Sequence, residues 1–360
     1  MNKKIIFSSG GTGGHIFPAI NLMKHYLDKG YRVLLVTDIR GSKFLKNYPE
    51  FESYIINTSS PINKNLFRKV LAYLTILFSI VKSFIILRKE KPCLVFGFGG
   101  YVSFPICFVS KFFKIPLIIY ENNIAMGIAN KYLTPHSKKV LYATKIPINF
   151  SEKYKNKLHF VGSILKKDIL NYSFNKKNID KYISILILGG SQGAEIFGKI
   201  IPPAIKLMKD KGYDIMVNQQ CIISQKESII KFYNENKINN NVFDFDKNIL
   251  KIISTADLAI TRCGASTIAE LAYSLTPFIA VPIPNSFDNH QYLNAKYYEN
   301  KKICWILEQK NFNTENLFNL IIKIIENKKN LENIRENMKS ENNKNAYTNI
   351  ENQIKEFLHL

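Results

Sequence analysis

The stretch IIFSSGGTGG, residues 5–14, joins a short apolar run to a loop that contains four glycines, and His15 follows it directly. A stretch of the same form, LILGGSQGA, lies at residues 186–194. Each reads as a buried strand that ends in a glycine-rich turn before a helix. Bare backbone N–H groups and a positive helix end meet at such a turn, and together they bind phosphate. The repeat therefore predicts two separate α/β domains of the nucleotide-binding type.

The rest of the chain alternates apolar runs with helical patterns, which is typical of βαβ units and doubly wound parallel sheets. The predicted strands are residues 4–8, 32–37, 94–97, 117–120 and 140–143, followed by residues 184–188, 215–218, 258–261 and 278–281. The expected fold class is α/β with two Rossmann-like domains. We place the first at residues 1–163 and the second at residues 164–340. Residues 341–360 are expected to form a helix that packs back on the first domain.

The charge of the chain is strongly positive and uneven. Of the formal +22, residues 1–163 carry +17 (24 Lys and Arg against 7 Asp and Glu), and residues 164–360 carry +5 (26 against 21). Such a surface attracts polyanions, either nucleic acid or anionic lipid. A nucleic-acid groove would interleave aromatic with basic residues, whereas here the aromatics lie in core-like runs, so no nucleic-acid partner is expected.

The five cysteines lie far apart with no C-x-x-C pair, which argues against a disulfide framework and against a zinc site. Glycines interrupt the first apolar run too early for a signal peptide. We therefore expect the chain to work in a reducing cytoplasm.

The glycine loops match neither of two common nucleotide motifs. GGTGGH lacks the Lys-Ser/Thr of a P-loop, and both loops fail the G-x-G-x-x-G spacing, so a nicotinamide-dependent oxidoreductase is disfavoured. A third loop lies within residues 256–273, with GAST at residues 264–267 at a helix start. Two compatible interpretations apply to Thr267 and Glu270. They can form a capping box, and they can lie where a diphosphate and a ribose diol bind.

Two residues are candidates for a general base. His15 lies at the mouth of the first loop, and an imidazole that titrates near neutrality can take a proton from an attacking hydroxyl. Glu121 follows the strand at residues 117–120, at the edge of the sheet where α/β sites gather. His15 is preferred and Glu121 is the alternative.

Six motifs in sequence order resemble the MurG family of glycosyltransferases: GGTGGHIFPAI, FGFGGYVSFP, YENN, GGSQGA, RCGASTIAE and DNHQYLNA. The resemblance implies the GT-B architecture, in which two Rossmann-like domains face each other across a cleft and a final helix crosses back. It also implies transfer of N-acetylglucosamine from UDP-N-acetylglucosamine to lipid I, giving lipid II for peptidoglycan. A GT-B transferase that glycosylates diacylglycerol is the alternative.

By motif position, the resemblance assigns eleven residues to the UDP-N-acetylglucosamine donor: Thr12, Gly13, Gly14, Asn123, Lys166, Ser191, Ala265, Ser266, Thr267, Glu270 and Gln291. The chain departs from the family pattern at residues 120–123, where YENN replaces His-Glu-Gln-Asn, and at residues 162–166, where GSILK replaces Gly-Asn-Pro-x-Arg. Lys166 keeps the charge of the arginine but not its forked geometry. His290 replaces a glutamine and Phe104 a glycine.

The implied mechanism is an inverting displacement, in which His15, or alternatively Glu121, takes the proton of the acceptor's 4-hydroxyl. UDP leaves toward the helix start at residues 264–267, where backbone N–H groups stabilise the developing charge. No Asp-x-Asp motif lies at these loops, so we expect no tightly bound metal and no other cofactor.

A lipid-linked acceptor requires contact with the bilayer, and residues 66–91 are the candidate segment. Their apolar stretch is close to the length that spans a membrane, and basic residues flank it at both ends. A spanning helix would split the first sheet between two compartments, so we reject it. Two interpretations of residues 66–91 remain, a buried crossover helix and a helix that lies in the membrane interface. The charge of the first domain favours the interfacial one, on the cytoplasmic face of the cell membrane.

Overall fold

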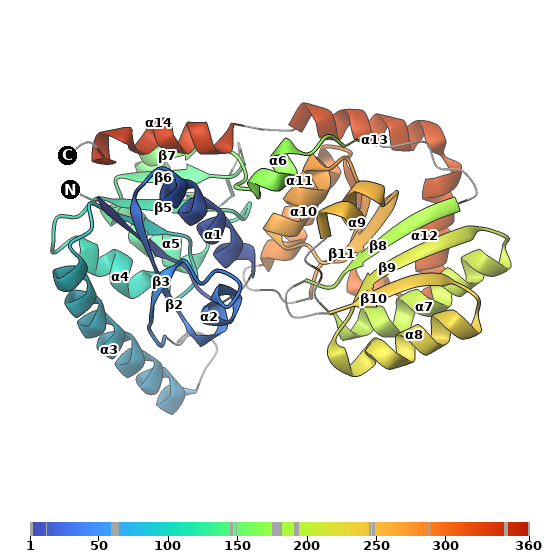
Figure 1. Cartoon of the computed structure of the whole chain (residues 1–360), viewed down its shortest axis with the longest axis horizontal. Coiled ribbons are helices and arrows are strands. Elements are labelled where there is room, and N and C mark those ends of the chain that lie inside the picture. The colour runs from blue at the N-terminus through green and yellow to red at the C-terminus, as the bar shows by residue number, and fades with distance from the viewer. Residues whose placement is uncertain are drawn as a thin grey trace. The chain divides into compact units, whose positions relative to one another are not determined.

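The computed structural model describes residues 3–11, 13–58, 65–144, 147–148, 150–174, 182–190, 194–244, 246, 249–284, 286, 289–341 and 345–358. The chain divides into two compact units. The first unit comprises residues 1–166 and 343–360, and the second comprises residues 167–342. Each unit is built on one parallel sheet with helices packed against it (Figure 1).

The first unit has a seven-stranded sheet in the order β3-β2-β1-β4-β5-β6-β7. Its strands are β1 (Lys4–Ser8), β2 (Arg32–Thr37), β3 (Glu52–Ile55), β4 (Leu94–Gly97), β5 (Leu117–Glu121), β6 (Lys139–Tyr142) and β7 (Leu158–Phe160). Its helices are α1 (Gly13–Asp28), α2 (Ile39–Leu45), α3 (Leu66–Glu90), α4 (Ser103–Ser110), α5 (Ile128–Leu133) and α14 (Ala346–Leu358), with 3₁₀ turns η1 (Thr134–His136) and η2 (Glu152–Lys157). The strand order reverses between β1 and β4, so the loops after these two strands form the switch point where α/β folds bind ligands.

The second unit has a six-stranded sheet in the order β10-β9-β8-β11-β12-β13. Its strands are β8 (Tyr182–Leu188), β9 (Asp214–Gln220), β10 (Asn239–Phe243), β11 (Leu258–Thr261), β12 (Phe278–Ala280) and β13 (Cys304–Ile306). Its helices are α6 (Lys167–Asn171), α7 (Glu195–Asp210), α8 (Lys226–Glu235), α9 (Ile249–Thr255), α10 (Ala265–Tyr273), α11 (His290–Asn300), α12 (Thr314–Glu326) and α13 (Lys328–Glu341), with 3₁₀ turns η3 (Ile223–Gln225) and η5 (Gln309–Asn311). Here the order reverses between β8 and β11.

Alternate residues of the central strands face opposite cores. In β8, Ile185 and Ile187 pack into one buried cluster with α7, α8 and α12. Leu186 and Leu188 pack into another, with α9, α10 and α11. Because a strand that is buried on both faces must be apolar throughout, these strands read as continuous apolar runs. The prediction of two doubly wound parallel sheets is confirmed.

The nine predicted strands are all present, with ends within two residues of the prediction. Four further strands, β3, β7, β10 and β13, are missing from the prediction, and they are the edge strands of the two sheets. An edge strand pairs on one side only and is less buried, so its sequence need not be apolar. β10, for example, begins with three asparagines.

The last helix, α14, packs on the first unit. The hydroxyl of Tyr347 donates a hydrogen bond to the carbonyl of Leu165 at 2.6 Å. Glu351 forms an ion pair with His25 of α1. These contacts join the end of the chain to the helix that follows the first glycine loop.

Candidate active site

The first glycine loop, residues 9–14, packs backbone against backbone on the loop after β4. Gly100 has a φ of 78°, and a Cβ there would lie 3.3 Å from the Cα of Gly10. A Cβ on Gly10 would in turn lie 3.2 Å from the side chain of Val102. This close approach requires glycine at both positions. Gly14 differs, because a Cβ there would meet no described atom within 4 Å, so its backbone borders open space.

Asp38 and Arg40 hold the first loop from the side of β2. Oδ1 of Asp38 accepts hydrogen bonds from the N–H groups of Gly11, at 3.2 Å, and Gly41, at 2.8 Å. Its Oδ2 accepts from both Nε and Nη2 of Arg40, at 3.0 and 2.8 Å. A side chain on Gly11, whose φ is 43°, would collide with the Arg40 guanidinium. Asp38 thus ties the N–H of Gly11 to the start of α2.

His15 lies in the first turn of α1, and its ring packs against Gly99 in the loop after β4. Gly99 has a φ of 88°, and a Cβ there would lie 3.3 Å from both Cε1 and Nδ1 of His15. The same position lies 3.3 Å from Nδ2 of Asn130, which donates to Glu121 at 2.8 Å. The fold thus brings the two candidate bases, predicted from separate motifs, to one edge of the sheet.

Glu121 is the last residue of β5 and is only 1% exposed. Its Oε1 accepts from the N–H and the Nδ2 of Asn123, at 3.0 and 3.1 Å. Its Oε2 accepts from the N–H of Gly127 at 3.0 Å and from Asn130. Four donors on one carboxylate commit it to holding the loop between β5 and α5. This geometry favours His15 over Glu121 as the proton acceptor.

The two segments that depart from the family pattern contact each other. The hydroxyl of Tyr120 accepts a hydrogen bond from the N–H of Ile164 at 3.1 Å, and the carbonyl of Gly162 lies 3.2 Å from it. Asn122 lies 3.2 Å from the same hydroxyl, and its Nδ2 donates to the carbonyl of Gly14 at 3.3 Å. Tyr120 therefore links the end of β5 and the first loop to the segment that leads to Lys166.

In the second unit, α10 begins at Ala265, with Gly264 as the N-cap residue and no side-chain capping hydrogen bond. Thr267 and Glu270 therefore lie inside the helix, and the capping-box interpretation is wrong. Ala265 is buried, whereas Ser266, Thr267 and Glu270 are partly exposed. No N-cap side chain covers the first turn of α10, so its backbone N–H groups can approach an anion.

Gln291 and Asn294 of α11 hold the third loop. Oε1 of Gln291 accepts from the N–H groups of Cys263, at 3.2 Å, and Ile283, at 3.1 Å. Nδ2 of Asn294 donates to the carbonyl of Cys263 at 3.2 Å. Both backbone polar groups of Cys263 are thus bound by one helix face. With its oxygen engaged, Gln291 can offer only its Nε2 to a sugar hydroxyl.

The remaining predicted site residues are placed as follows. Thr12 and Ser191 lie outside the described residues. Gly13 is the first residue of α1, Lys166 is half-buried at the end of the first unit, and His290 is the first residue of α11. In the part of the chain that the structure describes, no three His, Cys, Asp or Glu side chains cluster in a way that could hold a metal ion.

Arg262 and Asn294 are absent from the sequence-based prediction, although both lie inside motifs that it used. Both are polar residues buried next to the third loop, at 7% and 1% exposure. The signal that could have identified them is a polar residue among apolar neighbours in the sequence. Such a residue is expected to be buried and therefore to need specific hydrogen-bond partners.

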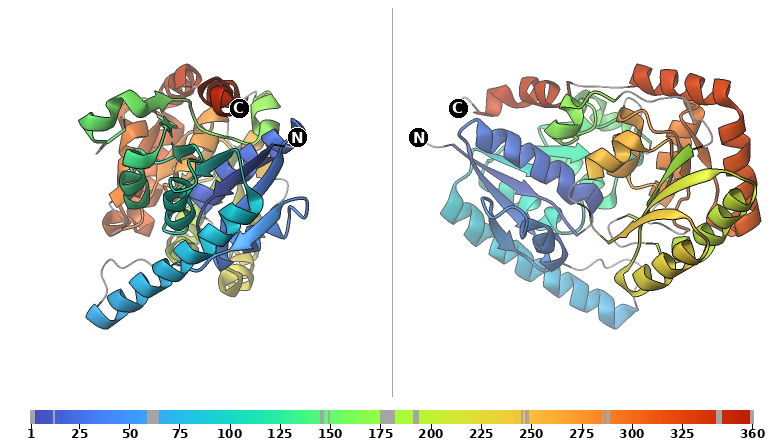
Figure 2. Two further views of the ribbon diagram at one scale, coloured as in Figure 1. Left: turned by 90° about the vertical axis from the view of Figure 1, so that its left-hand side faces the viewer. Right: turned by 45° about the vertical axis from the view of Figure 1, so that its right-hand side comes forward.

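Helix α3 runs along the outside of the first unit (Figure 2), and many of its large apolar side chains are exposed. The buried residues in its first three-quarters are small, namely Ala72, Ser79 and Ser83. The exposed ones include Phe67, Val70, Leu71, Tyr73, Leu74, Leu77, Phe78, Val81 and Ile85. This is the reverse of a core helix, so the buried-crossover alternative is wrong. Among the described helices, α3 alone is long and apolar enough to cross a membrane, judged by length and composition.

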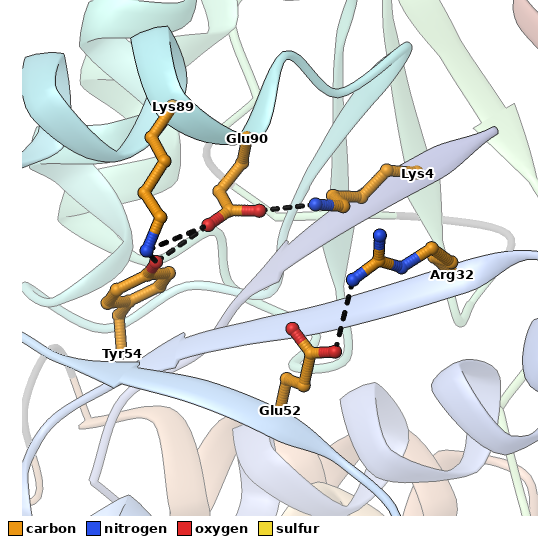
Figure 3. A network of polar contacts seen from close by, with 6 residues as sticks. All are labelled: Lys4, Arg32, Glu52, Tyr54, Lys89 and Glu90. Atoms are coloured by element: carbon orange, nitrogen blue, oxygen red, sulfur yellow. Dashed lines mark hydrogen bonds and ion pairs between the residues drawn. The ribbon is translucent and has the colours of Figure 1, made fainter. Parts of the chain in front are cut away.

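A polar network anchors the carboxyl end of α3 to the sheet (Figure 3). Glu90 pairs with Lys4 of β1 and accepts a hydrogen bond from the hydroxyl of Tyr54 in β3 at 2.6 Å. Nζ of Lys89 donates to the same hydroxyl at 3.0 Å. Earlier in α3, Nζ of Lys82 donates to the backbone carbonyl of Ile55 in β3 at 2.7 Å. The helix is therefore held in one orientation with its apolar face exposed.

Comparison with known proteins gives two domain matches. The glycosyltransferase family 28 N-terminal domain matches residues 5–142, and the glycosyltransferase family 28 C-terminal domain matches residues 184–354. The two domains together include all three glycine loops.

Curated relatives match over nearly the whole chain. The UDP-N-acetylglucosamine–N-acetylmuramyl-(pentapeptide) pyrophosphoryl-undecaprenol N-acetylglucosamine transferase of Pelagibacter ubique is 37% identical over 354 residues, which is 98% of each chain. The protein of the same name from Rickettsia canadensis is 36% identical and covers 93% of this chain and 94% of its own. Among solved structures, MurG of Acinetobacter baumannii matches with a TM-score of 0.78 and 26% identity over 98% of this chain and 99% of that one.

Proposed function

Because this chain belongs to the MurG family of glycosyltransferases, we infer that it transfers N-acetylglucosamine from UDP-N-acetylglucosamine to lipid I. The acceptor atom is the 4-hydroxyl of the N-acetylmuramyl unit, and the product is lipid II for peptidoglycan synthesis. The observation that carries this function is the near full-length identity to relatives that bear this name. Diacylglycerol as an acceptor is not favoured, because these relatives are named for a muramyl acceptor.

For the acceptor side, we propose that His15 takes the proton of the attacking hydroxyl. Its ring lies at the switch point of the first sheet, between the first glycine loop and Gly99. Glu121 would support the site by joining Asn123, in the loop after β5, to Asn130 in α5. The open space beside Gly14 is where a ligand can approach the first turn of α1 without meeting a side chain.

For the donor side, we propose that the first turn of α10 receives the diphosphate and that Glu270, one turn further, binds the ribose diol. Gly264 leaves the helix end uncovered, and α11 fixes the preceding loop through Gln291 and Asn294. Preorganised N–H groups at a helix end stabilise the charge that develops as UDP departs. These groups do the work that a divalent cation does elsewhere, so the proposal includes no tightly bound metal and no other cofactor.

The membrane is the second partner that we propose. The exposed apolar face of α3 would rest in the interface of an anionic bilayer, on its cytoplasmic side, where lipid I presents its head group. The excess of positive charge in residues 1–163 supports this contact, because anionic head groups attract basic segments. The chain would then act as a peripheral membrane enzyme.

The direct test of the function is a transfer assay. The protein is incubated with radiolabelled UDP-N-acetylglucosamine and a lipid I analogue, and the label is expected in a lipid-linked disaccharide. Parallel reactions with diacylglycerol, and with the lipid analogue whose 4-hydroxyl is blocked, should stay unlabelled. Labelling of diacylglycerol in place of the lipid I analogue would contradict the assignment.

A further inference from the structure

Arg262 lies between the second and third glycine loops of the second unit. It follows β11 directly and precedes the N-cap residue Gly264 by two positions. Its backbone N–H donates to the carbonyl of Leu188 at 3.1 Å, and its Cβ lies 3.8 Å from where a Cβ on Gly190 would be. The side chain therefore starts at the carboxyl edge of the central strands of this sheet.

The guanidinium of Arg262 is buried among neutral groups. The residue is 7% exposed. Its Nη1 donates to the carbonyls of Val281 and Pro282, at 3.1 and 3.4 Å, and its Nη2 donates to Oε1 of Gln309 at 2.7 Å. The ring of Phe197 lies 4.9 Å from the guanidinium carbon. Among the described residues no carboxylate pairs with it, and its Nε has no hydrogen-bond partner.

An unpaired charge in such a place is costly for the fold. Removing an ion from water costs several kcal/mol, and neutral hydrogen bonds return only part of that cost. Burial accordingly lowers the pKa of the Arg262 guanidinium. A half-buried cation elsewhere in the chain, Lys4, has an acidic partner in Glu90, whereas the partners of Arg262 are neutral. An anion that binds at the neighbouring loops would supply the missing negative charge.

We propose that Arg262 is a positioning residue for the donor, whose uncompensated positive charge lies behind the diphosphate site and attracts the diphosphate of the UDP-sugar. This inference rests on the proposed function. It adds a fixed charge beside the carboxyl edge of the sheet, from which the loops to α7 and α10 start, in a place where a buried arginine would ordinarily pair with a carboxylate. The effect is electrostatic, so it should scale with the charge of the nucleotide.

Gln309→Glu tests the proposal without removing the arginine. The substitution changes an amide oxygen that already contacts Nη2 into a carboxylate and so neutralises Arg262 in place. The matched control is Asn311→Asp, which adds the same charge on the same short turn at an exposed position. Binding of UDP and of uridine to the whole protein is measured by calorimetry, and folding is checked by thermal denaturation.

We expect Gln309→Glu to weaken UDP binding about tenfold or more while uridine binding and the melting temperature stay near those of the wild type. Asn311→Asp should change UDP binding less than about twofold, because its charge is exposed and screened. Arg262→Lys, which keeps the charge, should bind UDP better than Arg262→Met.

Three results would overturn the inference. One is unchanged UDP binding in Gln309→Glu. Another is an equal loss for UDP and uridine, which would indicate that Arg262 only shapes the loops. The third is equal UDP binding by the Lys and Met variants. If the wild type itself failed to bind UDP, the proposed function would fall together with this inference.

Discussion

His15 and Glu121 lie at the same sheet edge, yet their surroundings differ. Glu121 is buried and accepts four hydrogen bonds from the loop that follows it and from α5. Adding a proton to it would turn an acceptor into a donor and break one of these contacts. His15 lies half-buried on the first turn of α1, beside a glycine whose lack of a side chain leaves room for its ring.

The first prediction concerns His15. His15→Ala should lower kcat by about 10²-fold or more, because a general base contributes 10²–10⁴-fold, and should change KM for UDP-N-acetylglucosamine less than about threefold. The matched control is His136→Ala, which removes the same ring from the same unit away from the loops and should keep near wild-type kcat. Steady-state kinetics with a lipid I analogue give both constants. A loss confined to KM would reassign His15 to donor positioning.

At the scale of the element, α3 shows that a helix can have a strong apolar signal and still not belong to the core. Over the first three-quarters of the helix its buried residues are Ala72, Ser79 and Ser83. The hydroxyl of Ser79 donates to the carbonyl of Asn57, just after β3, and that of Ser83 donates to the carbonyl of Ser79. Its outward residues are large and apolar. Such an exposed face exceeds what a soluble surface normally carries, and it indicates an interaction site.

The second prediction tests this face against a bilayer. Phe78→Glu should weaken binding to vesicles that contain anionic lipid about tenfold, because it removes an apolar side chain that is 74% exposed and adds a repelled charge. Ile223→Glu changes an apolar residue of the second unit that is 76% exposed, and it should change binding less than about twofold. Cosedimentation at increasing salt measures both, and salt should release the wild type. Equal losses in the two variants would show that the added charge, and not α3, sets the affinity.

At the scale of the whole molecule, the chain leaves the first unit after Lys166 and returns to it as α14. Polar contacts hold α14 against α1 and against the segment that precedes Lys166. Glu351 of α14 pairs with both His25 and Lys29. Burial raises the pKa of Glu351, but hydrogen bonds from Lys29 and His25 outweigh it, so this pKa lies below its usual value.

The third prediction follows from that depressed pKa. A carboxylate of this kind stabilises the fold above its unfolded pKa, near 4.3, and the contribution is lost as the pH falls through the folded value. Glu351→Gln should therefore lower the melting temperature by about 2–4 °C at pH 7, and the difference from the wild type should narrow toward pH 3. Glu356→Gln, whose exposed side chain pairs with Lys139, should cost less than about 1 °C. A difference that did not change with pH would contradict the role of the ion pair.

Residues close together in the chain were enough to predict the class of fold and to mark the glycine loops where we propose the site. Central strands such as β1 and β8 are buried on both faces, so they must be apolar throughout and can be read directly. The glycine loops after them can be read too, because the φ values of Gly99, Gly100 and Gly190, at 88°, 78° and 81°, are ones that residues with a side chain rarely adopt. The edge strands were not predicted. An edge strand pairs on one side only and is less buried, so its sequence need not be apolar.

Only the tertiary structure decided what each polar residue does there. Four donors reach Glu121 from Asn123 and Gly127 in the loop after β5 and from Asn130 in α5, and no spacing in the sequence states that they converge. Thr267 and Glu270 fit a capping motif with Thr267 as the N-cap residue, but the N-cap residue is Gly264, three positions earlier. Apolar composition identified α3 as a helix, while its neighbours decided which face is buried. A pattern in sequence reports local geometry, whereas burial, partners and charge balance depend on residues that are distant in the chain and meet only when it folds.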